Sequence, residues 1–424
     1  MSIGFEVKTE RLAIEGGTPV RSMSLPLEPE ITEEEIQGVV EVLRNRQLSQ
    51  LAGSYVEDFE VEFARYVGAK YAVAVNSGTT ALSLALAAAR IGTGDEVIVP
   101  PYTFVATANG VLQQNAIPIF SDVDPETFNM DAEKLESKIS DKTRAIMPVH
   151  MFGQPCDMNP ILDVAGKHDL MVIEDAAQAA GAEYKGKKTG TIGQIGCFSF
   201  YLNKNITTAE GGMIVTNDEQ IATRAASIRN HCRPEVSNIP NVPAYNVFWG
   251  IGWNARMNSL QAAIGRGQLR RLEDSNRRRT QNAAYIRHYV EEFEWLRPQK
   301  VIKDAKPVYW MQAFRIDEDS KIDRDEFTSA VSAEGVKAEG YTPIPVHLQE
   351  LFTKQVGYGR THCPFDCPVY GKKIQYKAGD CPVAEKLCKQ DVVIPCYHSL
   401  RGSDLNDIAA ALTRVARWYE TKHR

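Results

Sequence analysis

Several features that mark whole classes of protein are missing from this sequence of 424 residues. No apolar run approaches the ~20 residues that a membrane-spanning helix needs, and the best candidate covers only residues 81–89. Lys and Arg number 48 against 54 Asp and Glu, for a net charge of −6, so no basic field favours nucleic acid. We therefore expect a protein that acts neither in a membrane nor on nucleic acid.

The glycine-rich signatures of nucleotide-binding folds are also absent. The sequence contains neither a P-loop nor a GxGxxG fingerprint, which argues against a nicotinamide-dependent oxidoreductase. Its first ten residues carry charges and no apolar segment of the kind found in signal peptides. We therefore expect a cytoplasmic protein.

Cysteine is sparse, with eight residues at irregular spacings, which suits a reducing compartment. Towards the C-terminus Cys363, Cys367, Cys381, Cys388 and Cys396 lie close together in the chain, with His362 and His398 nearby. These spacings match neither a zinc ribbon nor a ferredoxin. We expect buried thiols and no metal, with a metal site as the alternative.

What the sequence does contain is typical of a globular α/β protein. Hydrophobic residues make up 43% and charged residues 24%, and the length suggests about two to three domains. Strands are predicted over residues 71–75, 96–99, 117–120, 144–149, 170–173, 197–200 and 212–216, with helices over 79–91, 106–115, 131–139 and 159–168. Strands that alternate with helices in this way favour a parallel sheet.

A long polar helix is predicted over about residues 258–293, and shorter strand–helix units follow it, ending in a helix over about 403–419. We place a domain boundary within the long helix. Residues 1–275 would form an N-terminal segment and a large domain, and residues 276–424 a small α+β domain that carries the Cys-rich insertion.

Two turns in the predicted large domain could contact a cofactor. After the first strand, Ser77, Gly78 and Thr79 lead directly into a helix, whose free amides and dipole would suit a phosphate; simple helix capping is the alternative. After the second strand comes Phe104, which could stack on a flat ring or belong to the core.

An acidic strand end is the third feature. The apolar run at residues 170–173 ends in Glu174 and Asp175, and Gln178 follows three residues later. Ligands of α/β sheets bind at the carboxyl ends of strands, where a carboxylate can hold a ring nitrogen protonated, as a pyridoxal electron sink requires. Gln178 would lie on the same side of a first helical turn and could reach a ring hydroxyl. The alternative for Asp175 is that it only caps the helix.

A lysine in a turn is the fourth feature. Lys204 follows a short aromatic strand that contains Ser199, and precedes Glu210 and two glycines. A partly desolvated lysine can lose its proton and form an imine with an aldehyde cofactor, and the Ser199 hydroxyl could add to a phosphate site. A surface lysine in a hairpin is the alternative.

The order of these motifs resembles a known family. The succession SGTTAL, PPYTFVATAN, PVHMFG, VIEDAAQAAGA, FSFYLNK…AEGGMIVTND and GWNARMNSLQAAI is similar to the DegT/DnrJ/EryC1/StrS family of sugar aminotransferases. These are pyridoxal 5′-phosphate (PLP) enzymes of the aspartate-aminotransferase (type I) fold. The resemblance is strong over about residues 25–275 and weaker beyond, and it implies a large domain with a mostly parallel seven-stranded sheet.

The resemblance assigns a role to each motif residue. It implies that Lys204 bonds the cofactor and moves protons, and that Asp175 pairs with the ring nitrogen. It further implies that Gln178 approaches the ring hydroxyl, Phe104 stacks on the ring, Gly78, Thr79 and Ser199 hold the phosphate, and Asn254 reaches the phosphate from the neighbouring subunit of a homodimer. Ala209 stands where the family often has Gly, a tolerable departure.

The substrate is less well indicated. The start, Leu12 to Arg21, and the segment from Tyr341 to His347 look like the branch with cyclitol (scyllo-inosose) aminotransferases and 3-amino-5-hydroxybenzoate synthase. Tyr341 and His347 are candidate substrate contacts, although a structural tyrosine and a capped histidine are the alternatives. Arg256 is a candidate for the donor carboxylate.

The expected activity is transfer of an amino group from glutamate or glutamine to a keto group of a nucleotide-linked sugar or a cyclitol. Two alternatives share the fold: a dehydratase similar to 3-amino-5-hydroxybenzoate synthase, and a regulatory protein without turnover. Dehydratases of the family that carry His in place of the lysine are disfavoured by Lys204. The acceptor, the donor and the pathway are left open.

Overall fold

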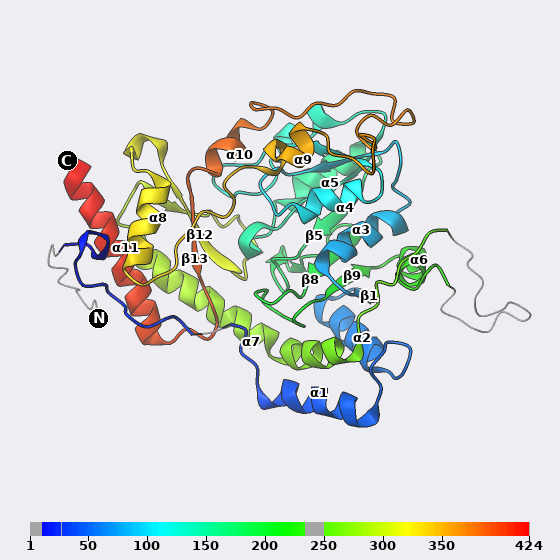
Figure 1. The fold of residues 1–424 in the computed structure, drawn as a ribbon, viewed down its shortest axis with the longest axis horizontal. Helices are drawn as coiled ribbons and strands as arrows, with labels where there is room; N and C mark the ends of the chain where they lie inside the picture. Colours follow the sequence, from blue (N-terminus) through cyan, green and yellow to red (C-terminus); the bar gives the residue numbers. More distant parts are fainter. Residues whose placement is uncertain (1–10, 27, 234–249, 424) are drawn as a thin grey trace, which may run out of the picture.

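The computed structural model describes residues 11–26, 28–233 and 250–423. A seven-stranded sheet forms the larger part of the molecule, in the strand order β1-β9-β8-β5-β4-β2-β3 (Figure 1). The strands are β1 (Tyr71–Val75), β2 (Glu96–Val99), β3 (Ile117–Phe120), β4 (Thr143–Ile146), β5 (Met171–Asp175), β8 (Ile195–Ser199) and β9 (Gly212–Thr216). Only β9 runs antiparallel to its neighbours, so the mostly parallel sheet expected from the sequence is confirmed.

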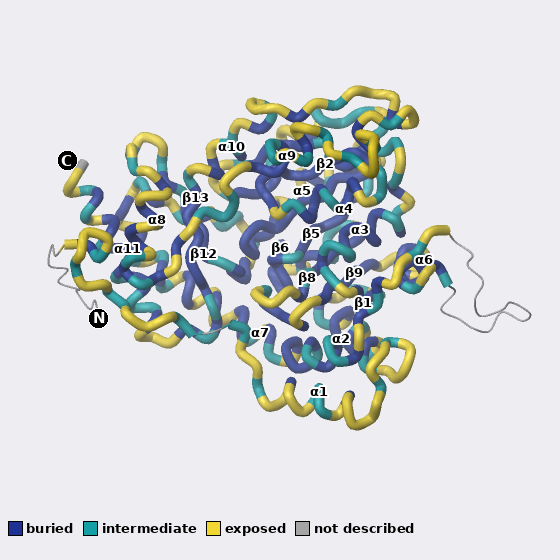
Figure 2. The backbone as a smooth tube through the Cα atoms, viewed as in Figure 1, coloured by how far each residue is buried: buried dark blue, intermediate teal, exposed yellow. Residues whose placement is uncertain are grey.

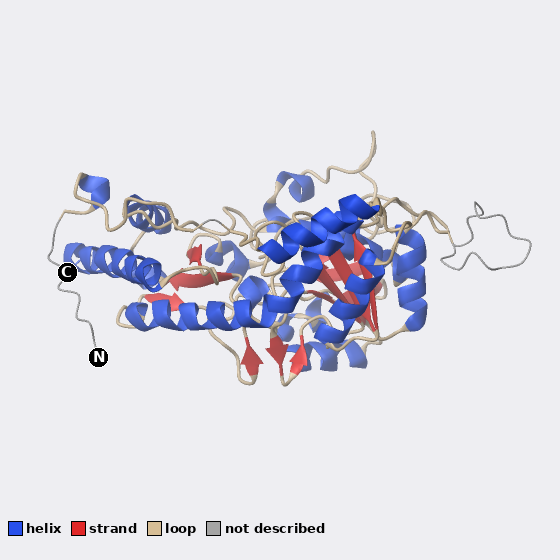
Figure 3. Cartoon of the chain, turned by 90° about the horizontal axis from the view of Figure 1, so that it is seen from below, coloured by secondary structure: helices blue, strands red, loops and turns tan. Residues whose placement is uncertain are grey.

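The strands form where short apolar runs can be buried on both faces. Every residue of β2 and of β9 is buried, as is usual for a parallel sheet covered by helices. Figure 3 shows the strands of the large sheet enclosed by helices. The helices around this sheet are α2 (Tyr55–Val67), α3 (Gly78–Ala88), α4 (Ala106–Leu112), α5 (Met158–Lys167) and α6 (Glu219–Arg229).

The prediction of a helix over residues 131–139 is wrong. The segment makes two 3₁₀ turns instead, Ala132–Lys134 and Glu136–Lys138. The Asp131 carboxylate accepts the Glu133 amide at 2.9 Å, and the Ser137 hydroxyl donates to the Lys134 carbonyl at 2.8 Å. These local bonds compete with helical ones, and so short a segment gains little from a helix of its own.

The long helix α7 (Ser259–Val290) joins the two parts of the molecule, and Figure 1 shows it extending from beneath the large sheet to the smaller one. It begins with a capping box between Asn258 and Gln261. Helix α1 (Glu33–Asn45) packs along its first half, and α11 (Gly402–His423) packs along its second half.

A small antiparallel sheet, β10-β12-β13, forms the second part. It consists of β10 (Leu296–Pro298), β12 (Met311–Ile316) and β13 (Asp391–Pro395), covered by α8 (Arg324–Ala333) and α11. Leu12, near the beginning of the described chain, is buried in the same core. The N-terminal segment thus packs with the C-terminal part of the molecule, although a division of the chain at residue 275 groups it with the large domain.

The Cys-rich insertion packs on the large sheet. Val346, Phe352 and Tyr376 belong to the core cluster of that sheet, and the Tyr376 hydroxyl donates to the carbonyl of Pro118 in β3 at 2.9 Å. The insertion contains α9 (Glu350–Thr353) and α10 (Pro382–Leu387). We assigned it to the C-terminal domain by its place in the chain, but its side chains extend the core of the N-terminal one.

The remaining short elements complete the chain. They are β6 (Glu183–Tyr184), β7 (Lys187–Lys188), β11 (Ala305–Lys306) and the 3₁₀ turns Ala13–Glu15, Met151–Gly153, Glu318–Ser320 and Val346–Leu348. Figure 2 shows the dark, buried interior of both sheets and the exposed outer side of α1.

All eight cysteines are free thiols, and six of them are buried. Within the described ranges, no group of three or more His, Cys, Asp or Glu side chains could hold a metal ion. None of the helices that the structure describes has the length and apolar character needed to span a bilayer.

Candidate active site

A cavity of about 450 Å³ opens at the carboxyl ends of the central strands. This is the edge at which ligands of α/β sheets bind. The structure brings together there most of the residues that the sequence singled out: Gly78, Thr79, Phe104, Asp175, Gln178, Ser199, Lys204 and Tyr341.

Lys204 enters the cavity from the turn between β8 and β9, where its amide donates to the Tyr201 carbonyl at 3.0 Å. Its Nζ lies 4.0 Å from the centre of the Trp310 ring. Burial lowers the pKa of Lys204 to about 8, and the negative charge of Asp175 acts in the opposite direction. A lysine in this state is partly neutral near physiological pH and can act as a nucleophile or a base.

Asp175 ends β5 with its carboxylate facing the cavity, and it is 4% exposed. Its Oδ2 accepts the Thr107 hydroxyl at 2.8 Å and its Oδ1 accepts the Ala177 amide at 3.1 Å. Burial raises the pKa of Asp175, while these two hydrogen bonds and the Lys204 charge lower it. A buried carboxylate is stabilised in its ionised form by a cation placed next to it, such as a protonated ring nitrogen.

The helix expected after Asp175 does not form. Turns follow instead, and in the first of them the Ala179 amide donates to the Ala176 carbonyl. Gln178 nevertheless points to the cavity from these turns. Its Oε1 accepts the Phe152 amide at 2.7 Å, and its Nε2 donates to the Tyr341 hydroxyl at 3.1 Å. The amide orientation of Gln178 is therefore defined from both ends.

The turn before α3 both caps the helix and forms one end of the cavity. The Ser77 hydroxyl accepts the Thr80 amide at 3.1 Å, which leaves the first amides of the helix, at Gly78 and Thr79, for another acceptor. A Cβ at Gly78 would lie 2.5 Å from the Cβ of Ser199. Glycine is needed here because β8 approaches the turn so closely.

Aromatic side chains form the cavity wall. Phe104 is 63% exposed and lines the opening, so it is not a core aromatic. Trp310 and Tyr341 also line the cavity, and both rings pack on Phe152. We did not identify Trp310 from the sequence, because a tryptophan at the start of the short apolar run at residues 310–316 has no local feature that separates it from a core residue.

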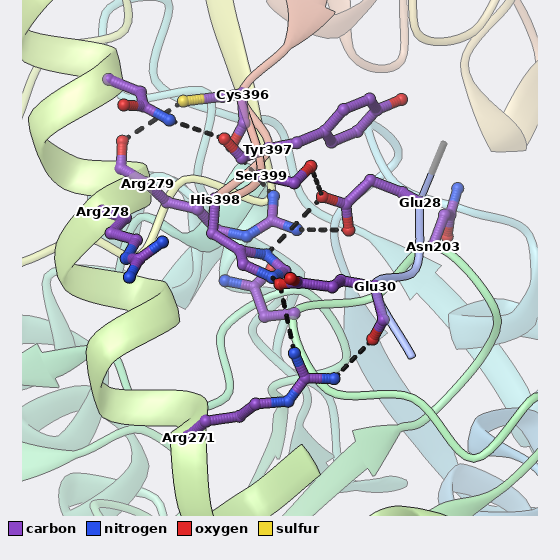
Figure 4. Close-up of polar contacts among 12 residues, drawn as sticks. Glu28, Glu30, Asn203, Arg271, Arg278, Arg279, Cys396, Tyr397, His398 and Ser399 are labelled. Carbon is purple, nitrogen blue, oxygen red and sulfur yellow. Dashed lines mark hydrogen bonds and ion pairs between the residues drawn. The ribbon is translucent and has the colours of Figure 1, made fainter. Parts of the chain in front are cut away.

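A buried arginine supports Trp310 from behind. Arg279 of α7 donates from Nη1 to the Trp310 carbonyl at 3.3 Å and to the Cys396 carbonyl at 3.0 Å, and its Nη2 lies 3.6 Å from the Glu28 carboxylate. Figure 4 shows Arg279 and Glu28 meeting near His398. The N-terminal segment, α7 and the end of β13 are thus tied together behind the cavity.

Three predicted residues lie elsewhere. His347 is buried, its Nε2 bonds the Glu385 carboxylate at 3.1 Å, and its ring packs against Phe120. The structure therefore supports the structural reading of this histidine. Arg256 donates to the Asn230 side chain at 2.6 Å, and Asn254 is exposed; neither lines this chain's cavity.

A family model described as the DegT/DnrJ/EryC1/StrS aminotransferase family matches residues 29–366. The chain belongs to this family. Its aminotransferases depend on PLP, and the cavity fits that cofactor: it offers an amine of lowered pKa at Lys204, a buried carboxylate at Asp175 and a helix N-terminus at Gly78. The family, the type I fold and the cofactor predicted from the sequence are confirmed.

Relatives of this aminotransferase are similar over nearly their whole length. GDP-perosamine synthase of Caulobacter vibrioides is 37% identical over 392 residues, which cover 91% of this chain and 96% of the relative. A putative L-glutamine:3-amino-2,3-dideoxy-scyllo-inosose aminotransferase of Micromonospora echinospora is 34% identical and covers 96% of this chain and 97% of its own. The aminotransferase from Psychrobacter cryohalolentis has a TM-score of 0.82 at 33% identity and covers 92% of this chain and 98% of its own.

Proposed function

We propose that this protein is a PLP-dependent aminotransferase that moves an amino group from glutamate or glutamine to a keto group of a sugar or a cyclitol. The observation that carries the proposal is the meeting of Lys204 and Asp175 in one cavity, with the first amides of α3 at its end. The relatives named for GDP-perosamine and for a scyllo-inosose support the acceptor class. They do not favour a dehydratase or a protein without turnover.

Each cavity residue has a proposed task. Lys204 would hold the cofactor covalently, Asp175 would pair with its ring nitrogen, and Gln178 would approach its ring hydroxyl. Phe104 would stack on the ring, and Gly78, Thr79 and Ser199 would bind the phosphate. Their places around the cavity support these tasks.

Bound PLP supplies an electron sink for the charge that develops when the donor loses its α-proton. The Lys204 Nζ would accept that proton, because its lowered pKa keeps part of the amine neutral. The same nitrogen would then return the proton. Asp175 would hold the ring nitrogen in its protonated form, and in the second half-reaction Lys204 would make the same proton transfers in reverse on the keto substrate.

A second subunit is part of the proposal. Asn254 is exposed, as Trp253 and Ile251 beside it are, at 37% and 84%. We propose that this segment contacts a second copy and brings Asn254 to that copy's phosphate site. Light scattering on the purified protein checks this: a mass of about twice the monomer is expected, and a monomer that is fully active would contradict it.

Two further residues are proposed to contact the donor and the acceptor. Among the residues that the structure describes, no arginine lines the cavity. A donor carboxylate therefore needs a cation from elsewhere, and Arg256, close to Asn254 in the chain, is our proposal. Tyr341 faces the cavity and is proposed to contact the acceptor.

Reduction of the purified protein with borohydride, after incubation with PLP, tests the function directly. We expect the visible absorbance to disappear and the cofactor mass to be found on the peptide that contains Lys204. A parallel incubation with glutamate or glutamine and a keto-sugar or keto-cyclitol should give a new amine. Labelling of a different lysine, or an aromatic product in place of the amine, would contradict the proposal.

A further inference from the structure

Tyr341 is held from outside the cavity by a buried carboxylate. Its backbone amide donates to the Oδ2 of Asp391 at 2.5 Å. Asp391 begins strand β13, and its side chain is 0% exposed. No bond of this kind was predicted from the sequence, since Tyr341 and Asp391 are 50 residues apart.

An arginine holds the other oxygen of the same carboxylate. The Nη1 of Arg324, at the start of α8, donates to Asp391 Oδ1 at 3.1 Å and to the Asp391 carbonyl at 3.1 Å. Arg324 is itself 9% exposed. Gly340 makes room for it, because a Cβ at that position would lie 1.7 Å from the Arg324 Nη1.

From Tyr341 the contacts continue to the proposed cofactor site. The Tyr341 hydroxyl accepts the Nε2 of Gln178 at 3.1 Å, and its ring lies 5.1 Å from the ring of Phe152. Polar contacts thus connect α8 and β13, through Tyr341, with the Gln178 side chain that lines the cavity. A small rotation of Tyr341 would move the Gln178 amide, and small misplacements near reacting groups are costly.

We propose that Asp391 and Arg324 are positioning residues for the active site: the ionised Asp391 carboxylate, held by Arg324, fixes Tyr341 and through its hydroxyl the amide of Gln178. The proposal rests on the proposed function, because it takes Gln178 to be a cofactor contact. It extends the site to two residues of the small sheet and α8 that touch neither cofactor nor substrate.

The charge state of Asp391 gives the arrangement a pH dependence. Burial raises the pKa of Asp391 to about 6, against the Tyr341 amide and the Arg324 charge, which lower it. A protonated carboxyl carries its proton on one oxygen and accepts hydrogen bonds less well. Below that pH the hydrogen bond from the Tyr341 amide or from Arg324 therefore weakens.

Among the described residues, Tyr102 and Cys388 also face this carboxylate, in addition to Arg324 and Tyr341. Burial and the Asp391 charge raise the pKa values of Tyr102 and Cys388 above their usual ranges, so both are neutral near pH 6. Asp325 pairs with the Nε of Arg324 at 2.6 Å, and its side chain is 81% exposed.

Asp391→Asn tests the proposal, and Asp325→Asn is the matched control because it removes a carboxylate from the same arginine on the solvent side. Two quantities are measured: the affinity of the apoenzyme for PLP, by absorbance titration, and kcat/KM against pH. For Asp391→Asn we expect both to fall about tenfold at neutral pH. In the wild type kcat/KM should fall as the pH drops through about 6, where Asp391 takes up its proton, and this acidic limb should be absent in Asp391→Asn. Asp325→Asn should stay within about twofold of wild type, on the weakness of exposed ion pairs.

Tyr341→Phe separates positioning from general stability. If Asp391 acts through the Tyr341 hydroxyl, the double variant that combines Asp391→Asn with Tyr341→Phe should bind PLP no worse than Asp391→Asn alone. The reason is that substitutions at coupled residues do not have additive effects on the free energy. Effects that multiply, or an unchanged acidic limb in Asp391→Asn, would overturn the proposal. If Asp391→Asn does not fold, Arg324→Lys is measured in its place. We expect a smaller loss of PLP affinity and of kcat/KM, and wild-type values of both would contradict the proposal. Borohydride labelling of Lys204 in every variant shows whether the proposed function itself holds.

Discussion

Lys204→Ala is expected to abolish amino transfer, with kcat lower by about 10³-fold or more. The reason is that one nitrogen has two tasks, covalent attachment of the cofactor and movement of the α-proton, and proton transfer by a positioned base alone contributes about 10²- to 10⁴-fold. The lowered pKa of Lys204, about 8, equips it for both. The measurement is amine formation in a single turnover, together with the mass of the borohydride-reduced protein.

A matched lysine variant controls for loss of charge. Lys187 in β7 is exposed, and Lys187→Ala should leave both kcat and cofactor labelling unchanged. Small primary amines added to Lys204→Ala should restore part of the rate, because they can carry the proton that the side chain no longer moves. If Lys204→Ala kept more than about a tenth of the wild-type rate, the catalytic assignment of Lys204 would be wrong.

The strands of the large sheet could be predicted because each is a short apolar run between turns, and burial on both faces demands that pattern. Lys204 and Asp175 could be placed for the same reason: they follow strand ends, and strand ends of a parallel sheet share one edge. The local rule failed after Asp175, where turns stand in place of the expected helix, yet Gln178 still faces the cavity. Position relative to the strand mattered more than the type of the next element.

Long-range packing is what the sequence did not reveal. Nothing local distinguishes His347, which is bonded to Glu385, from a histidine that reaches a substrate. The insertion packs on the large sheet through residues such as Phe352 and Tyr376, which look like any aromatic residues of a small domain. Asp391 and Trp310 contribute to the site only because the small sheet is docked behind it, and no periodicity encodes that docking.

Asp175→Asn is the second large effect that we expect, a loss of about 10²- to 10³-fold in kcat with the cofactor still attached to Lys204. Asparagine has the same shape and can keep a hydrogen bond with Thr107, but it cannot hold a ring nitrogen in its cationic form. Charge stabilisation of this kind, lost from a preorganised site, costs about that factor. Steady-state kinetics and the borohydride label, measured on one preparation, separate the loss of rate from a loss of cofactor.

The same variant should also change the titration of Lys204. The negative charge of Asp175 raises the pKa of Lys204 against the effect of burial, so its removal should lower that pKa further below about 8 and shift the pH dependence of Lys204 acylation in the apoenzyme to lower pH. Thr107→Val is the control, since it removes the 2.8 Å hydrogen bond to Asp175 and leaves the charge. It should cost about tenfold or less in kcat and move the Lys204 titration little; equal effects of the two variants would mean that the hydrogen bond, not the carboxylate charge, is what the site requires.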